Sequence, residues 1–252
     1  MQTNRAPTTP CFFLRSLLAL GLGCGLLACS PVEPDAQPDA SLMPASTRRA
    51  ELSAGWALYT IDVGAHSARI SGGQPGNPIQ WFTRVLGRDF QFRMNPSARY
   101  VLTRPTQPED QLDWNKLPGF SDCGTLDLSQ DGAMFGWRWR VDTTPTVLEI
   151  TAYANNRGKH LTPTAPLFTL DEADLASDAP LRYRVFIEGA QYRFTVQGTV
   201  RGRTIHAATT LPRACPSSAP TALKWASGLY FGGTSTAPSK ITGAISEVDF
   251  RP

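Results

Sequence analysis

Histidine and cysteine are scarce in this sequence, and their scarcity excludes several kinds of site. The chain has 3 histidines and 5 cysteines, and no two cysteines have the C-x-x-C spacing of a zinc site. The motifs G-x-S-x-G, H-E-x-x-H and G-x-x-x-x-G-K are absent, as is a dinucleotide-binding fingerprint. A nucleophile-elbow hydrolase, a zinc protease and a nucleotide-binding enzyme are therefore not indicated.

Amphipathic helices and an excess of one charge are also missing. No segment has the 3.6-residue hydrophobic period of a surface helix. The chain carries 24 Lys and Arg against 21 Asp and Glu, and removing Arg5 and Arg15 with an N-terminal signal leaves 22 against 21. A nearly neutral chain lacks the basic surface that binds nucleic acid, so no nucleic-acid partner is expected.

The N-terminal residues have the order of a secretory signal. Arg5 and Arg15 precede an apolar run over 17–28, which is shorter than the about 20 apolar residues that cross a bilayer. The run ends at Leu26-Leu27-Ala28-Cys29, which resembles the lipobox of bacterial lipoproteins. In that family the cysteine thiol receives diacylglycerol, the signal is cleaved before it, and acyl chains such as palmitate anchor the protein in a membrane.

The resemblance implies a lipoprotein signal peptide at 1–28 and lipidation of Cys29. Ser30 after the cysteine resembles lipoproteins forwarded to the outer membrane of Gram-negative bacteria. Residues 29–47 are mainly Pro, Ala, Ser and acidic residues, which is typical of a flexible spacer. Residues 48–252 have a length that suits one sandwich domain. We therefore expect a domain that is tethered to the cell envelope, with the membrane as a partner through the lipid anchor.

Cys123 and Cys215 are the cysteines that remain once the signal is removed and Cys29 is acylated. In an oxidising compartment such a pair is expected to form a structural disulfide. Closing a loop of this length would stabilise the fold by roughly 4 kcal/mol.

Hydrophobic and polar residues of this domain alternate with a period of two, which is typical of half-buried strands. The pattern is clearest over 181–188 and 192–197, and Gly189 between them predicts a β-hairpin. Further strands are predicted at 56–63, 79–86, 89–94, 98–103, 133–141, 147–153, 198–207 and 240–250. Residues 169–176 are expected to form a short helical turn or a loop. The predicted fold class is all-β, an antiparallel β-sandwich of the jelly-roll type.

Three segments carry a family resemblance. They are D-W-N-K-L with G-F-S-D-C over 113–123, F-G-W-R-W over 135–139, and Y-F-G-G with T-A-P over 230–238. Together they resemble poorly characterised secreted bacterial lipoproteins with a concanavalin-like jelly-roll domain, over about residues 55–250. The resemblance implies the fold more firmly than an activity.

The same fold class includes polysaccharide lyases of the alginate type, and two segments are distantly similar to theirs. K-W-A-S-G-L-Y-F over 224–231 is similar to the lyase segment that supplies a tyrosine, and Thr204-Ile205-His206 is similar to its Q-I-H. This similarity implies Tyr230 and His206 as candidate catalytic residues. The R-x-E-x-R strand of those enzymes is missing.

Arginines offer the charge that an acidic glycan would require, since their guanidinium groups match carboxylates or sulfates bidentately. The candidates, which alternate with apolar residues on predicted strands, are Arg138, Arg140, Arg182 and Arg184. If those strands share a sheet, they form one cationic face. The alternative is that each arginine pairs with an acid of a neighbouring strand, such as Glu149 or Glu188.

Aromatic residues divide in the same way between a ligand surface and the core. Trp137 and Trp139 alternate with charged residues and are expected in the core. Trp81, Trp114 and Trp225 lie near predicted turns, so they are candidate platforms for stacking on sugar rings.

The segment D-L-S-Q-D-G over 127–132 is similar to the opening of a calcium loop. Arg138 stands at the twelfth position, where an EF-hand has a bidentate Glu, so an EF-hand is excluded. A looser calcium site at Asp122, Asp127 or Asp131 and a polar turn remain the two interpretations. Otherwise no metal or cofactor is predicted.

The sequence thus predicts a membrane-anchored lipoprotein whose β-sandwich binds a glycan. One alternative is a polysaccharide lyase that acts on uronate-containing polysaccharide, with Tyr230, His206, Arg138 or Arg184 as catalytic candidates. The other is a structural envelope lipoprotein. The absence of a complete catalytic motif favours a binding protein over an enzyme.

Overall fold

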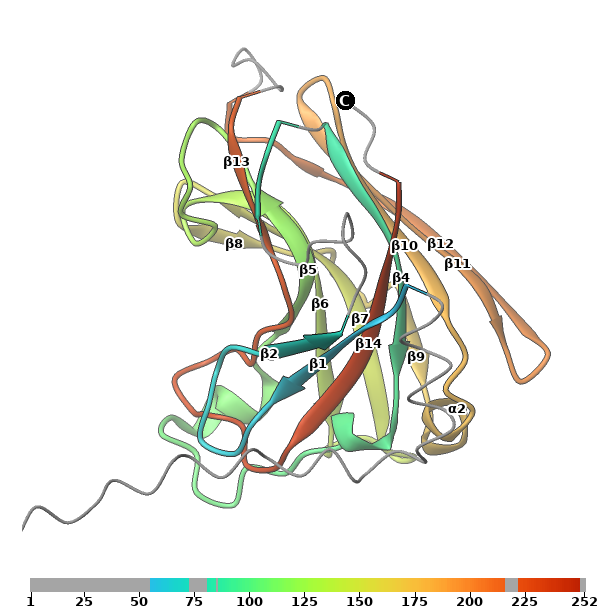
Figure 1. Ribbon diagram of the computed structural model, residues 1–252. Helices are drawn as coiled ribbons and strands as arrows, with labels where there is room; N and C mark the ends of the chain where they lie inside the picture. Colours follow the sequence, from blue (N-terminus) through green and yellow to red (C-terminus); the bar gives the residue numbers. More distant parts are fainter. Residues whose placement is uncertain (1–54, 73–80, 85, 216–221, 250–252) are drawn as a thin grey trace, which may run out of the picture. The chain divides into compact units, whose positions relative to one another are not determined.

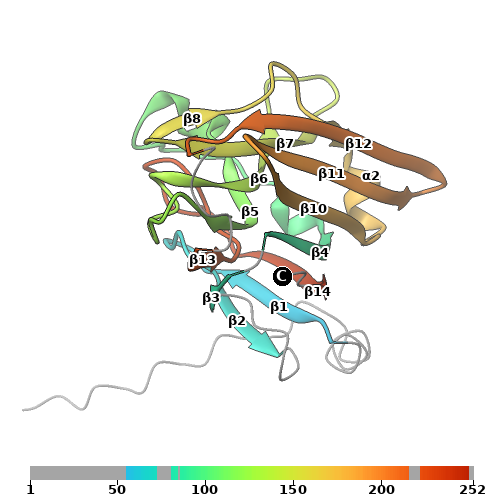
Figure 2. The ribbon, with the colours of Figure 1, turned by 90° about the horizontal axis from the view of Figure 1, so that it is seen from above.

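A computed structural model describes residues 55–72, 81–84, 86–215 and 222–249 of the chain. The predicted signal, spacer and Cys29 lie outside these residues. The described strands form two antiparallel sheets (Figures 1 and 2). Among the described residues, no helix is long and apolar enough to cross a membrane.

The first sheet, sheet A, has seven strands. In spatial order they are β12 (Arg203–Pro212), β11 (Gln191–Val200), β10 (Leu181–Glu188), β4 (Gly87–Met94), β14 (Ile241–Asp249), β1 (Ala57–Ile61) and β2 (Arg69–Gly72). The predicted hairpin is confirmed, because β10 and β11 pair directly and Gly189 turns the chain with a φ of 59°.

The second sheet, sheet B, also has seven strands. In spatial order they are β3 (Trp81–Thr83), β13 (Lys224–Ser227), β5 (Asn115–Ser121), β6 (Asp131–Arg140), β7 (Val147–Asn156) and β8 (Lys159–Leu161), and β9 (Phe168–Leu170) also pairs with β7. Within the described ranges, three short helices connect the strands: η1 (Pro96–Ala98), η2 (Pro108–Leu112) and α2 (Glu172–Ala176).

The two sheets pack face to face through one hydrophobic core, as a sandwich requires. Phe135 of β6 makes edge-to-face contacts with Tyr183 of β10 and Phe194 of β11, at 5.1 and 5.2 Å between ring centroids. Trp137 and Trp139 point into the same core, which confirms their predicted burial. The all-β sandwich expected from the alternating pattern is therefore the fold of this domain.

Two predicted strands are wrong. Residues 98–103 form no strand, because the side chain of Gln111 accepts a hydrogen bond from the Leu102 N–H and donates one to the Tyr100 carbonyl, in place of a neighbouring strand. Residues 198–207 do not form one strand, because the chain turns at Arg201 and Gly202 between β11 and β12.

The helical turn predicted within 169–176 is present as α2. Asp171 caps it by accepting a hydrogen bond from the Asp174 N–H at 2.7 Å. The predicted disulfide between Cys123 and Cys215 is also present, and it joins the turn after β5 to the segment after β12. The disulfide therefore links a connection of sheet B to a connection of sheet A.

Candidate functional site

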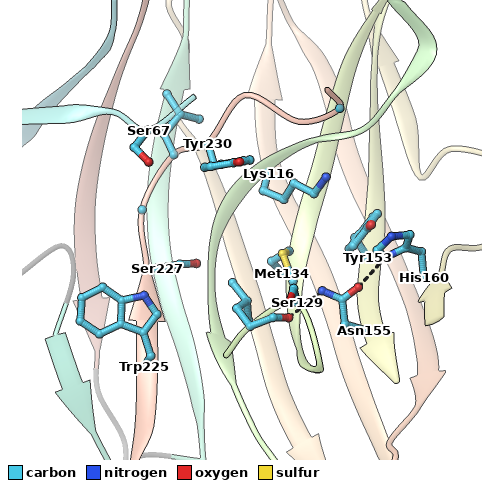
Figure 3. Close-up of a pocket in the computed structure, with 14 residues that line it drawn as sticks. Ser67, Lys116, Ser129, Met134, Tyr153, Asn155, His160, Trp225, Ser227 and Tyr230 are labelled. Carbon is cyan, nitrogen blue, oxygen red and sulfur yellow. Dashed lines mark hydrogen bonds between the residues drawn. The ribbon is translucent and has the colours of Figure 1, made fainter. Parts of the chain in front are cut away.

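A groove opens on the face of sheet B that points away from the core. Side chains of β7 point alternately to the two faces of the sheet. Ala152 and Ala154 therefore lie in the core, whereas Tyr153 and Asn155 line the groove. Its first lobe has a volume of about 550 Å³ and is lined from β13, β5, β6, β7 and β8 (Figure 3). A second lobe, of about 460 Å³, adjoins it and is lined by Asp113, Trp114 and Thr162 among others.

Four residues line both lobes and therefore lie at their junction. They are Lys116, Tyr153, His160 and Gly233. A ligand that fills both lobes would contact all four residues.

Lys116 of β5 is the lysine at this junction. Its ammonium group donates a hydrogen bond to the Trp114 carbonyl at 2.6 Å and lies 4.9 Å from the centre of the Tyr153 ring. Within the described part of the chain, no carboxylate lies within ion-pair distance of it. Burial lowers the pKa of Lys116 to about 8, and the negative charge of Asp113 opposes this shift.

Backbone packing fixes the position of Lys116. Its N–H donates to the Tyr230 carbonyl at 2.8 Å, and the Tyr230 N–H donates back to the Lys116 carbonyl at 3.0 Å. A Cβ atom added at Gly232 would lie 2.2 Å from the Trp114 carbonyl oxygen and 2.8 Å from Lys116 Nζ. Only glycine allows the chain to pass this close to Lys116.

His160 and Asn155 form a hydrogen-bonded pair beside Tyr153. The Asn155 amide nitrogen donates to the Leu128 carbonyl at 2.6 Å, so its oxygen accepts from His160 Nδ1, also at 2.6 Å. This arrangement places the proton on Nδ1 and leaves His160 Nε2 as the nitrogen available to a ligand. Burial raises the pKa of the Tyr153 phenol, so this group is a neutral donor near neutral pH.

Tyr230 stands at the rim of the first lobe with 40% of its surface exposed. Its ring stacks on His66, with 5.4 Å between centroids and 14° between planes, and His66 donates from Nδ1 to the Phe231 carbonyl. The predicted catalytic candidate Tyr230 therefore lines the groove. Ser227 also lines it, and its hydroxyl is buried without a hydrogen-bond partner in the structure.

The predicted platforms Trp114 and Trp225 have different environments, and the side chain of the third, Trp81, lies outside what the structure describes. Trp225 is half-buried on β13 and lines the first lobe. Trp114 lines the second lobe, but the guanidinium group of Arg138 lies 4.0 Å from the centre of its ring and covers one face. Both tryptophans therefore line the groove, and one face of the Trp114 ring is already occupied by Arg138.

The predicted single cationic face is not formed, because the strands that carry the arginines do not share a sheet. Arg138 and Arg140 lie on β6 of sheet B, and both pair with Glu149, at 2.7 and 2.9 Å. Arg182 and Arg184 lie on β10 of sheet A, where they share the carboxylate of Asp89, at 2.6 and 3.0 Å. The alternative interpretation, pairing with acids of neighbouring strands, describes these arginines.

His206 does not join Tyr230 in one site. It is exposed on β12 of sheet A, where the preceding Ile205 points into the core. Strand alternation therefore directs His206 to the outer face of sheet A, whereas Tyr230 lines the groove of sheet B.

The three acids of the predicted calcium site each have a partner within the protein. Asp122 accepts from Arg213 and Tyr192, Asp127 accepts from the Ser129 N–H, and Asp131 accepts from the Arg157 N–H. The Asp127 hydrogen bond is local to a turn, whereas Asp122 and Asp131 accept from residues distant in the sequence. Among the described residues, the one cluster with metal-ligand spacing consists of Asp122 with the two disulfide-bonded cysteines.

Sequence reasoning missed Lys116, Tyr153, Asn155 and His160. Lys116 lies within the D-W-N-K-L segment that carried the family resemblance, and Tyr153 is the last residue of the strand predicted at 147–153. Asn155 and His160 lie outside the predicted strands, and the alternating pattern contains no signal that one face of the sheet is hollow.

No family model matches the sequence, and no curated protein matches it. Similar solved structures include an alginate lyase from Klebsiella pneumoniae, which is 14% identical with a TM-score of 0.43 and covers 80% of this chain and 96% of its own. A GH16 protein from Bacteroides ovatus, bound to a G4G4G3G product, is 7% identical with a TM-score of 0.36, over 76% of this chain and 80% of its own. The CBM2 module of a Lactobacillus casei phage J-1 evolved Dit protein is 11% identical with a TM-score of 0.34, over 78% and 92%. These values describe a distant likeness and assign no activity to this chain.

Proposed function

We propose that the protein binds an acidic glycan in the groove of sheet B. The observation that carries this proposal is the ammonium group of Lys116, which lies at the junction of the two lobes without a carboxylate partner among the described residues. A partly buried charge is costly when nothing compensates it. A carboxylate or sulfate of the ligand would supply the missing counter-ion.

The rest of the groove suits a sugar, which has apolar ring faces and hydroxyl edges. Trp225 and Tyr230 offer aromatic surface in the first lobe. The unpartnered hydroxyl of Ser227 and the Nε2 atom of His160 offer hydrogen bonds. A mainly apolar hollow with a few convergent polar groups is typical of a ligand site.

The cellular setting of the proposed function is the envelope. We propose that acylated Cys29 anchors the mature chain in the outer membrane and that residues 29–47 act as a spacer. The spacer would let the groove meet a polysaccharide at a distance from the membrane surface.

Replacing Lys116 tests the binding proposal. Lys116→Met should weaken binding of an acidic polysaccharide by about 10- to 100-fold, because a hydrogen bond to a charged group contributes about 1.5–3 kcal/mol. Isothermal titration calorimetry with hyaluronan, polygalacturonate and neutral dextran measures this change. Lys159→Met is the matched control, because it removes the same charge from an exposed position on β8 of the same sheet. Equal affinities of the wild type and Lys116→Met would contradict the proposal.

A second candidate function is lyase chemistry, which the position of Tyr230 favours because it lines the same groove as Lys116. In this reaction a base removes the C5 proton of a uronate, the C4–O bond breaks, a C4=C5 double bond forms and the leaving oxygen takes up a proton. Lys116 would neutralise the uronate carboxylate. Tyr230 would take up the C5 proton and donate a proton to the leaving oxygen.

The C4=C5 double bond of the product allows lyase activity to be tested directly. Incubation with polygalacturonate or hyaluronan should yield an unsaturated product that absorbs ultraviolet light, and Tyr230→Phe should abolish its formation while leaving binding in place. His206→Ala is the control, since His206 lies on the other sheet. Intact polymers after prolonged incubation would leave binding as the function.

A further inference from the structure

The two lobes of the groove differ in charge. The residues that line the first lobe include no Asp or Glu. The second lobe is lined by Asp113, the residue after η2, together with Trp114 and Thr162. Lys116 lies between these two regions, so the groove offers an uncharged end, a cation at its centre and an acid at the other end.

Asp113 differs from its neighbour Asp110 in how its carboxylate is used. The Asp110 carboxylate accepts hydrogen bonds from Thr234 at 2.9 Å, from the Gln107 N–H at 3.1 Å and from the Ser235 hydroxyl. In the described residues, no hydrogen bond or ion pair engages the carboxylate of Asp113. Asp110 therefore holds a loop in place, whereas Asp113 presents its charge to the second lobe.

The carboxylate of Asp113 lies beside Gly233, which lines both lobes of the groove. Its Oδ2 atom lies against Gly233, where a Cβ atom would approach it to 2.8 Å. Burial raises the pKa of Asp113, and the positive charge of Lys116 opposes this shift. A carboxylate that is poorly hydrated repels a second anion more strongly than one in bulk water does.

We infer that the groove selects a heteropolysaccharide in which the acidic sugar held at Lys116 is followed, on the side of the second lobe, by a sugar without negative charge, such as a neutral or amino sugar. A homopolymer of uronates would place its next carboxylate in the second lobe against Asp113. Discrimination by like-charge repulsion is a common source of specificity. This inference rests on the proposed binding function and adds the class of ligand.

The test compares two acidic oligosaccharides of equal length. Hyaluronan oligosaccharides alternate glucuronate with N-acetylglucosamine, and galacturonate oligosaccharides carry a carboxylate on every unit. The wild-type protein should bind the alternating oligosaccharide more tightly. Asp113→Asn should raise the affinity for oligogalacturonate relative to that for hyaluronan by about fivefold or more, the factor that matches about 1 kcal/mol of repulsion.

Glu109→Gln is the matched control, because it removes a negative charge from an exposed position on the adjacent η2. It should leave both affinities unchanged. Asp113→Asn keeps the shape of the side chain and breaks no hydrogen bond of the described structure, so its unfolding midpoint should match that of the wild type.

The outcomes separate this inference from the function on which it rests. Equal affinities of the wild type for the two oligosaccharides, or an equal change of both affinities in Asp113→Asn, would overturn the selection of a heteropolysaccharide and leave acidic-glycan binding intact. Failure of the wild type to bind either oligosaccharide would overturn the proposed function itself.

Discussion

Lys116 titrates within the range of pH in which binding experiments are done. Because its pKa is lowered from that of a free lysine to about 8, the side chain is charged below this pH and neutral above it. If the ammonium group meets a ligand anion, the dissociation constant should rise as the pH increases through about 8. Calorimetric titrations of hyaluronan between about pH 7 and 9.5 measure this change.

Lys116→Arg provides the control for this pH dependence, because a guanidinium group keeps its charge throughout that range. Asp113, Tyr153 and His160 line the same groove and remain unchanged in this variant. A pH dependence that persists in Lys116→Arg would assign it to a group other than Lys116.

At the residue scale, the sequence predicted burial correctly where aromatic and charged residues alternate along a strand. Trp137 and Trp139 alternate with charged residues, as expected for a strand with one buried face, and both are buried. Sequence reasoning failed for the arginine face because the sequence does not state which strands are neighbours. It missed Lys116 because a single lysine on a strand has no pattern that separates a ligand site from a solvated surface.

The η2 helix replaces a strand partner for the segment that follows η1. Gln111 accepts from the Leu102 N–H at 2.7 Å and donates to the Trp139 carbonyl at 3.1 Å, so it joins this segment to sheet B. Gln111→Ala should lower the free energy of unfolding by about 1–3 kcal/mol, because partly buried backbone groups would lose their partner. Urea unfolding measures this change. Gln130→Ala, at an exposed position, should have little effect and serves as the control.

At the element scale, strict alternation and a turn marked by glycine correctly predicted the hairpin of β10 and β11. Residues 98–103 have a similar composition but satisfy their backbone through Gln111, which no local pattern indicates. The short strands β2, β8 and β13 have too few residues to display a period. The groove is lined in part by β8 and β13, so its outline could not be predicted.

At the scale of the whole molecule, the disulfide spans 92 residues and links connections of the two sheets. In the chain-entropy model, closing such a loop contributes about 4–5 kcal/mol by restricting the unfolded chain. Replacing Cys123 and Cys215 together with serine should lower the unfolding temperature by about 10 °C or more. Thermal unfolding followed by circular dichroism checks this expectation, and the wild type treated with a reductant should move to the same midpoint. An unchanged midpoint in both samples would show that packing of the core alone sets the stability.

Gly232 limits how the sequence around Lys116 can change during evolution. Because the backbone at Gly232 leaves no space for a Cβ atom against the Trp114 carbonyl and Lys116 Nζ, every amino-acid substitution at this position would displace the amine from the junction of the lobes. Positions 116 and 232 are therefore expected to change together or not at all during divergence. Descendants that lose the glycine should also have lost the lysine, and with it the ability to recognise an acidic ligand.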